Sequence, residues 1–181
     1  FDFQIESATA EAIHRCREDL YRIAAERVFA ELKELLVSPG CARLMLEFRD
    51  VFAVILPEVE PLFDFDQNNP HHDSDGWHHT ARTVAAVRPD VVLRLSALLH
   101  DTGKPDCKTR DEAGISHFYG HNRRSKELAH AALLRLRCDN DTRLQVETLV
   151  GMHDSPMPQT MAQTRRFLGK YGLELTRKLL E

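Results

Sequence analysis

Apolar residues recur at three- and four-residue steps through much of this chain, and this spacing is what most restricts its fold. The clearest run covers residues 11–37 and predicts one long amphipathic helix. Residues 38–40, Ser-Pro-Gly, interrupt the pattern, because proline cannot continue the helical hydrogen bonds. A second helix is predicted over residues 42–56, so that residues 1–60 form a helical neck.

Residues 57–75 contain three prolines and no helical period, and they predict a long loop. Asp90 occupies the position of a helix N-cap ahead of an apolar run over residues 91–99, which therefore reads as a buried helix rather than a strand. The fold class predicted is all-α, with residues 61–181 as a second helical unit. Its further predicted helices cover residues 77–87, 125–137, 142–153, 161–168 and 173–180.

The composition, with 43% hydrophobic and 29% charged residues, is typical of a globular protein, and no apolar run predicts a membrane span. A formal net charge of -4 gives no general attraction to nucleic acid, so RNA would have to bind local basic faces. The four cysteines form no CxxC pair and no signal peptide precedes them, which favours a cytoplasmic location.

Nine of the ten histidines fall between His71 and His153, several of them at the ends of predicted helices. Imidazole nitrogens together with carboxylate oxygens suit a divalent ion such as Zn, Mn, Fe, Co or Ni, with Mg as the less favoured alternative. His100 and Asp101 directly follow the apolar run, so one helix end delivers both side chains to the same point.

Thr-Gly-Lys follows this pair at once. Gly103 permits a sharp turn, and Lys104 offers a positive charge to a phosphate group. The string His-Asp-Thr-Gly-Lys is the most specific motif of the sequence.

His79, the His100–Asp101 pair and Asp154 resemble, in order and in helix context, the ligand set of the HD superfamily of metal-dependent phosphohydrolases. In that family the ligands come from separate helices of one bundle. The resemblance implies an HD-domain bundle in which these four residues bind the metal. His153 competes with Asp154 for the fourth position, as does an aspartate from a more distal helix.

The same resemblance implies hydrolysis of a phosphate ester, in which the metal acidifies a bound water and polarises the phosphoryl oxygen. Asp101 would bridge or orient the nucleophile, and His121 or His153 would protonate the leaving oxygen. His121 also resembles a family histidine that lies near the phosphate or binds a second ion.

A closer resemblance, to the carboxy-terminal part of bacterial tRNA nucleotidyltransferases of the CCA-adding and poly(A) polymerase family, runs over nearly the whole chain. Residues 26–32 match its ERxxxEL motif, residues 1–13 its neck exit, and Asn-Pro-His-His at 69–72 the entry to its HD region. It implies a tRNA partner, a role in tRNA 3'-end processing, and phosphatase or 2',3'-cyclic phosphodiesterase activity. The family's nucleotide-adding motifs would lie before Phe1, so this piece alone is not expected to add nucleotides.

Two alternatives stay open at this point. The first is a free-standing HD-domain phosphohydrolase acting on nucleotides. The second is a metal-free helical scaffold that only binds tRNA.

Overall fold

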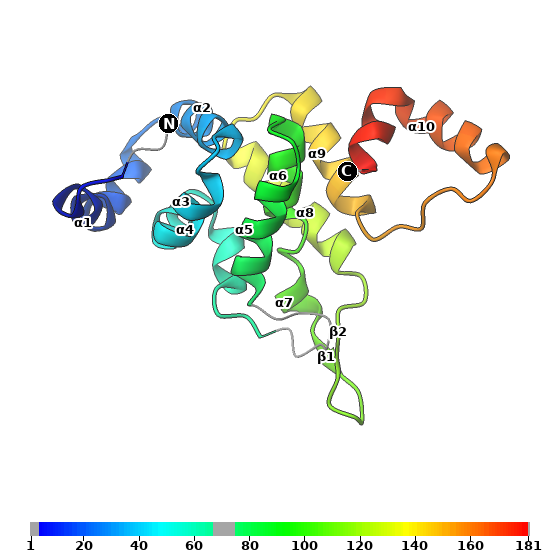
Figure 1. Ribbon diagram of the computed structural model, residues 1–181, viewed down its shortest axis with the longest axis horizontal. Helices are drawn as coiled ribbons and strands as arrows, with labels where there is room; N and C mark the ends of the chain where they lie inside the picture. Colours follow the sequence, from blue (N-terminus) through cyan, green and yellow to red (C-terminus); the bar gives the residue numbers. More distant parts are fainter. Residues whose placement is uncertain (1–3, 67–74, 181) are drawn as a thin grey trace.

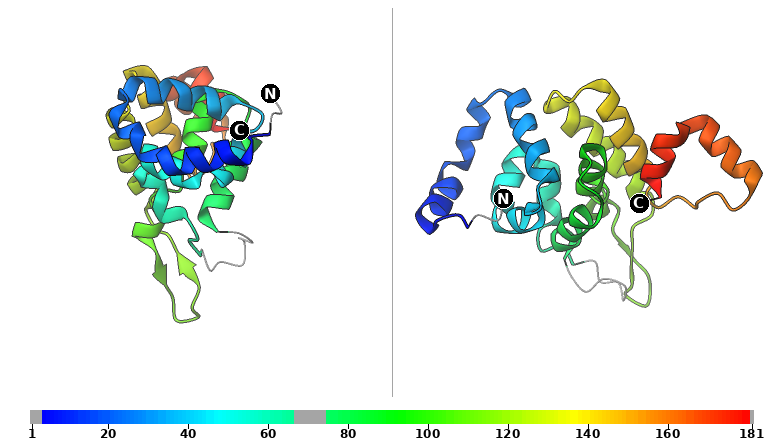
Figure 2. Two further views of the ribbon diagram at one scale, coloured as in Figure 1. Left: turned by 90° about the vertical axis from the view of Figure 1, so that its left-hand side faces the viewer. Right: turned by 45° about the horizontal axis from the view of Figure 1, so that its top comes forward.

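The computed structural model describes residues 4–66 and 75–180 and confirms the all-α fold class (Figure 1). Two short strands, β1 (Thr109–Arg110) and β2 (Ser116–His117), pair antiparallel in a hairpin that projects away from the helices (Figures 1 and 2). The other elements are α1 (Ser7–Cys16), η1 (Arg17–Arg22), α2 (Ala25–Val37), α3 (Cys41–Glu47), α4 (Arg49–Ile55), η2 (Pro57–Leu62), α5 (Gly76–Ala86), α6 (Val91–Leu99), α7 (Lys104–Cys107), α8 (His121–Arg135), α9 (Asn140–Met152) and α10 (Met161–Leu179), where η denotes a 3-10 helix.

The single long helix predicted over residues 11–37 is wrong. The chain forms α1, tightens into η1, and then becomes extended at Ile23 (φ -93°, ψ 141°) and Ala24 (φ -56°, ψ 133°) before α2 begins. The helix predicted over residues 42–56 is likewise divided into α3 and α4 at Phe48, whose φ of -112° and ψ of 37° lie outside the helical region. The neck is therefore helical but folds back on itself.

Helix α6 lies at the centre of the molecule and contacts α2, α5, α8 and α9 (Figure 1). All of its residues from Val92 to Leu99 are buried, as its nearly continuous apolar composition predicts. The predicted N-cap is confirmed, since the Asp90 carboxylate accepts a hydrogen bond of 3.1 Å from the Leu93 amide. The guanidinium of buried Arg94 donates hydrogen bonds to acceptors that include the Cys41 sulfur at 2.8 Å.

The neck and the later helices share one hydrophobic core, which contains residues from Phe29 to Val150. Trp77 links them, because it is buried in α5 and its indole nitrogen donates to the Met45 carbonyl oxygen of α3 at 3.1 Å. The segment predicted as a loop begins with η2, which buries Val59 and Leu62. The boundary near residue 60 and the HD-domain assignment remain predictions.

The two short helices predicted near the end of the chain are confirmed: both lie within α10, and Gly172, whose φ of 74° and ψ of 170° are not helical, separates them. The end of α10 returns to α6, because Lys178 Nζ lies 2.8 Å from Asp90 Oδ1. Among the described residues, no helix is both long and apolar enough to cross a membrane.

Candidate metal centre

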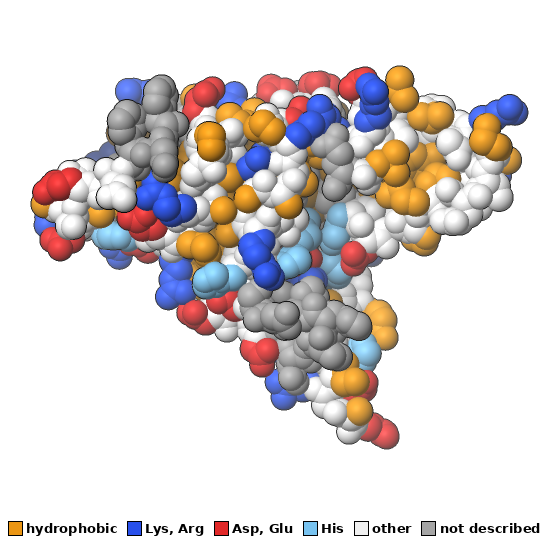
Figure 3. Space-filling model, in the orientation of Figure 1, with side chains coloured by type: hydrophobic (Ala, Val, Ile, Leu, Met, Phe, Trp, Pro, Cys, Tyr) orange, Lys and Arg blue, Asp and Glu red, His pale blue; other side chains and the backbone are white. Residues whose placement is uncertain are grey.

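A pocket of about 580 Å³ lies where the ends of α6 and α9 meet the first turns of α5 and α8. Figure 3 shows histidine side chains gathered near the middle of this face. The structure brings together in the pocket lining every predicted site residue, namely His79, His100, Asp101, Lys104, His121, His153 and Asp154.

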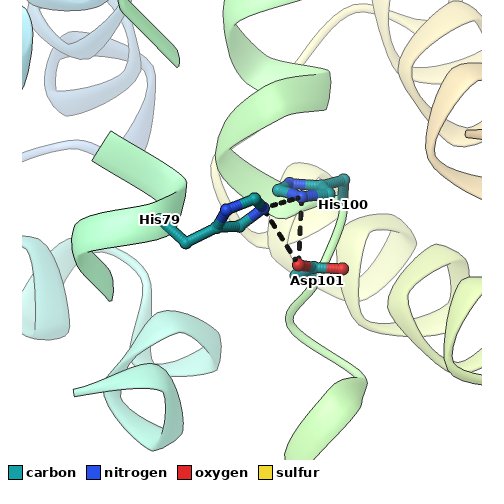
Figure 4. Close-up of side chains that lie close together, drawn as sticks. All are labelled: His79, His100 and Asp101. Carbon is teal, nitrogen blue, oxygen red and sulfur yellow. Dashed lines mark hydrogen bonds and ion pairs between the residues drawn. The ribbon is translucent and has the colours of Figure 1, made fainter. Parts of the chain in front are cut away.

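His79, His100 and Asp101 form the first group of converging ligand atoms (Figure 4). His79 Nε2 lies 3.3 Å from His100 Nε2 and 3.5 Å from Asp101 Oδ2, and His100 Nε2 lies 3.1 Å from Asp101 Oδ2. A metal–ligand distance of about 2.1 Å places neighbouring ligand atoms of a tetrahedron about 3.4 Å apart. The spacing of these three atoms therefore fits a shared divalent ion.

Asp101, His121 and His153 form a second such group on the other side of the same carboxylate. His121 Nε2 lies 3.4 Å from Asp101 Oδ1 and 3.0 Å from His153 Nε2, and His153 Nε2 lies 3.7 Å from Asp101 Oδ1. His121 is the first residue of α8, because Gly120 adopts a left-handed φ of 79° and turns the chain into the helix there. Asp101 is common to both groups.

Three of the histidines are oriented by the same kind of backbone bond. In each, Nδ1 contacts a carbonyl oxygen three residues earlier, as in His100 with Ala97 at 2.7 Å, His121 with Phe118 at 2.9 Å and His153 with Val150 at 2.7 Å. A carbonyl oxygen only accepts, so Nδ1 carries the hydrogen and Nε2 of the neutral ring turns its lone pair into the pocket. Ring nitrogens that face one another in this way are placed to share a cation.

The Asp101 carboxylate is 2% exposed, and among the described residues its Oδ1 atom is buried without a hydrogen-bond partner. Burial alone would raise the pKa of Asp101, but the neighbouring imidazoles, His100 first and then His121 and His153, hold that pKa far below its usual range. The carboxylate is therefore charged and still has one oxygen to offer. A buried charge with an unsatisfied oxygen fits the binding of a cation.

Lys104 lies in the pocket wall with its ammonium 2.7 Å from Asp101 Oδ2 and 5.5 Å from the centroid of the Phe118 ring. Its side chain is 11% exposed, so it is held in place rather than sampling solvent. This position fixes the orientation of the Asp101 carboxylate. The contact of Lys104 with a phosphate group stays a prediction.

Asp154, predicted as the fourth metal ligand, lies at the rim of the pocket with a side chain that is 59% exposed. Its carboxylate oxygens lie 3.2 Å from His121 Nε2 and 3.7 Å from His153 Nε2, next to the second group rather than the first. Burial works against protonation of His153, but the Asp101 carboxylate, the Val150 carbonyl oxygen and the Asp154 carboxylate together outweigh this and raise its pKa. Ligation by Asp154 stays a prediction.

Sequence reasoning missed Ser125, which supports the turn after Asp101. The Gly103 amide donates to Ser125 Oγ at 2.9 Å, and a Cβ atom at Gly103 would lie 2.6 Å from the Ser125 nitrogen and 2.7 Å from the His121 oxygen. Gly103 is therefore needed for close packing against α8, since its φ of -86° is open to any residue. Ser125 could have been suspected from its place one helical turn after His121.

Comparisons with known proteins agree with the resemblance described above. Residues 2–63 match the family described as "Probable RNA and SrmB- binding site of polymerase A". The A-adding tRNA nucleotidyltransferase of Deinococcus radiodurans is 35% identical over 179 residues, which cover 92% of this chain and 41% of that protein. The CC-adding tRNA nucleotidyltransferase of Thermus thermophilus is 37% identical over 152 residues, which cover 80% of this chain and 35% of that protein.

The multifunctional CCA protein of Azoarcus sp. is 35% identical over 127 residues, covering 67% of this chain. The chain spans between 30% and 41% of the length of these three relatives. Residues 1–3 and 69–72, which carry part of the resemblance, lie outside the described residues. The rest of the resemblance extends through both the neck and the pocket. The chain therefore belongs to the tRNA nucleotidyltransferase family and matches the carboxy-terminal region of its members.

Proposed function

We propose that this chain takes part in tRNA 3'-end processing and carries a metal-dependent phosphohydrolase site of the phosphatase or 2',3'-cyclic phosphodiesterase type. The observation that carries the proposal is the position of Asp101, whose two carboxylate oxygens each face a pair of imidazole Nε2 atoms. A surface carboxylate or a helix cap does not need such an arrangement.

His79, His100 and Asp101 would hold one divalent ion, and Asp101, His121 and His153 would hold a second. The nitrogen-rich donor set favours Mn, Fe, Co, Ni or Zn over Mg. Divalent ions in such a pocket polarise a phosphoryl oxygen and make water a nucleophile at neutral pH.

The remaining pocket residues orient the reaction. Lys104 holds the Asp101 carboxylate through its 2.7 Å contact and contributes positive charge to the wall that a phosphate group would approach. His153, with its raised pKa, can hold a proton for the leaving oxygen when only the first group binds an ion. Asp154 at the rim supports the protonated form of His153.

The tRNA part of the proposal rests on the neck. Residues 2–63 match a family described by RNA binding, and the relatives that match most of the chain are named for tRNA. The neck would thus contact tRNA while the pocket acts on a phosphate ester. This favours the reading as part of a tRNA nucleotidyltransferase-like protein over a free-standing nucleotide phosphohydrolase.

The test combines metal analysis with hydrolysis assays. Protein purified without added ions should contain stoichiometric transition metal and hydrolyse 2',3'-cyclic AMP. Asp101→Asn should lose metal from both groups, and we expect its hydrolysis to fall by about 100-fold or more. His130→Gln is the matched control, because His130 lies in α8 but pairs with Glu147 at 2.9 Å instead of lining the pocket.

A purified chain that binds tRNA with neither metal nor hydrolysis would refute this proposal and favour the metal-free scaffold. Equal activity of the wild type and Asp101→Asn would also refute it.

A further inference from the structure

A second groove of about 630 Å³ lies between the segment that follows α9 and the first half of α10. One wall consists of Pro156, Met157 and Pro158, and the other presents Phe167 and Tyr171 from successive turns of the helix. The two rings lie 4.8 Å apart at an interplanar angle of 57°. Figure 3 shows this apolar surface on the same face as the histidines.

The groove is also positively charged, although the whole chain has a net charge of -4. Residues 155–173 contain three basic residues, Arg165, Arg166 and Lys170, and no acidic residue. Arg166 and Lys170 line the groove, and Lys170 Nζ lies 4.8 Å from the centroid of the Tyr171 ring. In the described part of the chain, the ion pairs that α10 forms involve Arg177 and Lys178 instead.

The groove and the proposed metal pocket border one another at adjacent residues of the chain. Met152 lines the groove, and the next two residues, His153 and Asp154, line the pocket. A linear molecule lying in the groove would therefore be directed towards the pocket. Aromatic rings interleaved with cations bind the bases and phosphates of single-stranded nucleic acid through stacking and charge.

We infer that this groove binds unpaired nucleotides of a single-stranded RNA whose phosphate ester enters the metal pocket. The inference rests on the proposed function for the choice of RNA, and it names the substrate class as an oligonucleotide rather than a free nucleotide. Phe167 and Tyr171 supply the stacking surface, and Arg166 and Lys170 contact the backbone phosphates.

Binding of a fluorescently labelled single-stranded oligoadenylate to the intact chain tests this by anisotropy, in EDTA so that hydrolysis plays no part. Replacing Tyr171 with leucine should weaken binding by roughly 5- to 150-fold, the range for loss of one stacked base, whereas Tyr171→Phe should retain it. The double variant Arg166→Ala/Lys170→Ala should lower the slope of log affinity against log salt by about 1.4, from about 0.7 per phosphate contact.

Arg165→Ala is the matched control, since it removes the same charge from the same helix but Arg165 does not line the groove. It should change the affinity less than about twofold. Equal weakening by Arg165→Ala and Arg166→Ala would overturn the inference, as would tighter binding of duplex RNA than of the single strand. So would a dimer that buries α10, detected by sedimentation.

Because the assay contains no metal, groove binding without hydrolysis in a separate metal-loaded assay would leave the groove established and refute only the phosphohydrolase proposal.

Discussion

Gly103→Ala offers a direct test of how the turn between Asp101 and α8 is built. An added Cβ would lie 2.6 Å from the Ser125 nitrogen, 2.7 Å from the His121 oxygen and 2.8 Å from the Arg124 Cβ. Two of these atoms belong to the backbone of α8 and cannot rotate away. Overpacking of this kind costs about 2–3 kcal/mol, which lowers the melting temperature of a chain of this size by about 4–12 °C.

The matched control is Gly169→Ala, because a Cβ at Gly169 meets no atom within 4 Å. Gly169 lies within α10, where alanine is the better helix former, so this variant should gain roughly 0.5–1 kcal/mol. Thermal melts by circular dichroism compare the two, and metal analysis reports on the pocket, since Gly103 lies between Asp101 and Lys104. If Gly103→Ala has the same melting temperature and the same metal content as the wild type, the close-packing argument is wrong.

Three further predictions concern the scaffold. Burial raises the pKa of the Cys138 thiol to about 11, so iodoacetamide at mildly alkaline pH should label exposed Cys16 at least about tenfold faster, as measured by mass spectrometry. Burial acts to raise the pKa of Asp90, but hydrogen bonds from Lys178 and Leu93 and nearby positive charges together lower it. The stability that Asp90 contributes is thus present above its unfolded pKa of about 3.8 and is lost as pH falls below that value. Asp90→Asn should therefore melt below the wild type at neutral pH, and the difference should vanish in acid. Trp77→Phe removes a buried hydrogen bond and leaves a void, so urea unfolding should show a loss of about 2–3 kcal/mol, and an unchanged midpoint would contradict this.

The central helix and the His100–Asp101 pair at its end were predictable from sequence because local signals agree there. The apolar run, the Asp90 cap and the adjacent His100 and Asp101 all specify one buried helix that ends at a polar point. The convergence of His79 on that point came from family resemblance rather than from periodicity. It depends on how α5 packs against α6, which no local pattern determines.

The neck was harder to predict, because apolar spacing continues across the break between η1 and α2. Ile23 and Ala24 are ordinary helix-compatible residues, and their extended conformation comes from folding α1 and η1 back against α4. A similar difficulty affected the start of α8. The predicted start of α8 at residue 125 omitted its first turn, which begins at His121 because Gly120 takes a left-handed conformation.

If the proposed ions bind, the bonds from Nδ1 of His100, His121 and His153 to main-chain oxygens also determine how the protein would respond to losing one. Because the backbone holds each ring in its rotamer, little side-chain entropy remains to be lost when an ion arrives. An ion would then bind to a site whose side chains are already in position. Chelators should remove the metal from this protein without unfolding it. In small zinc domains, by contrast, folding and metal binding are a single transition.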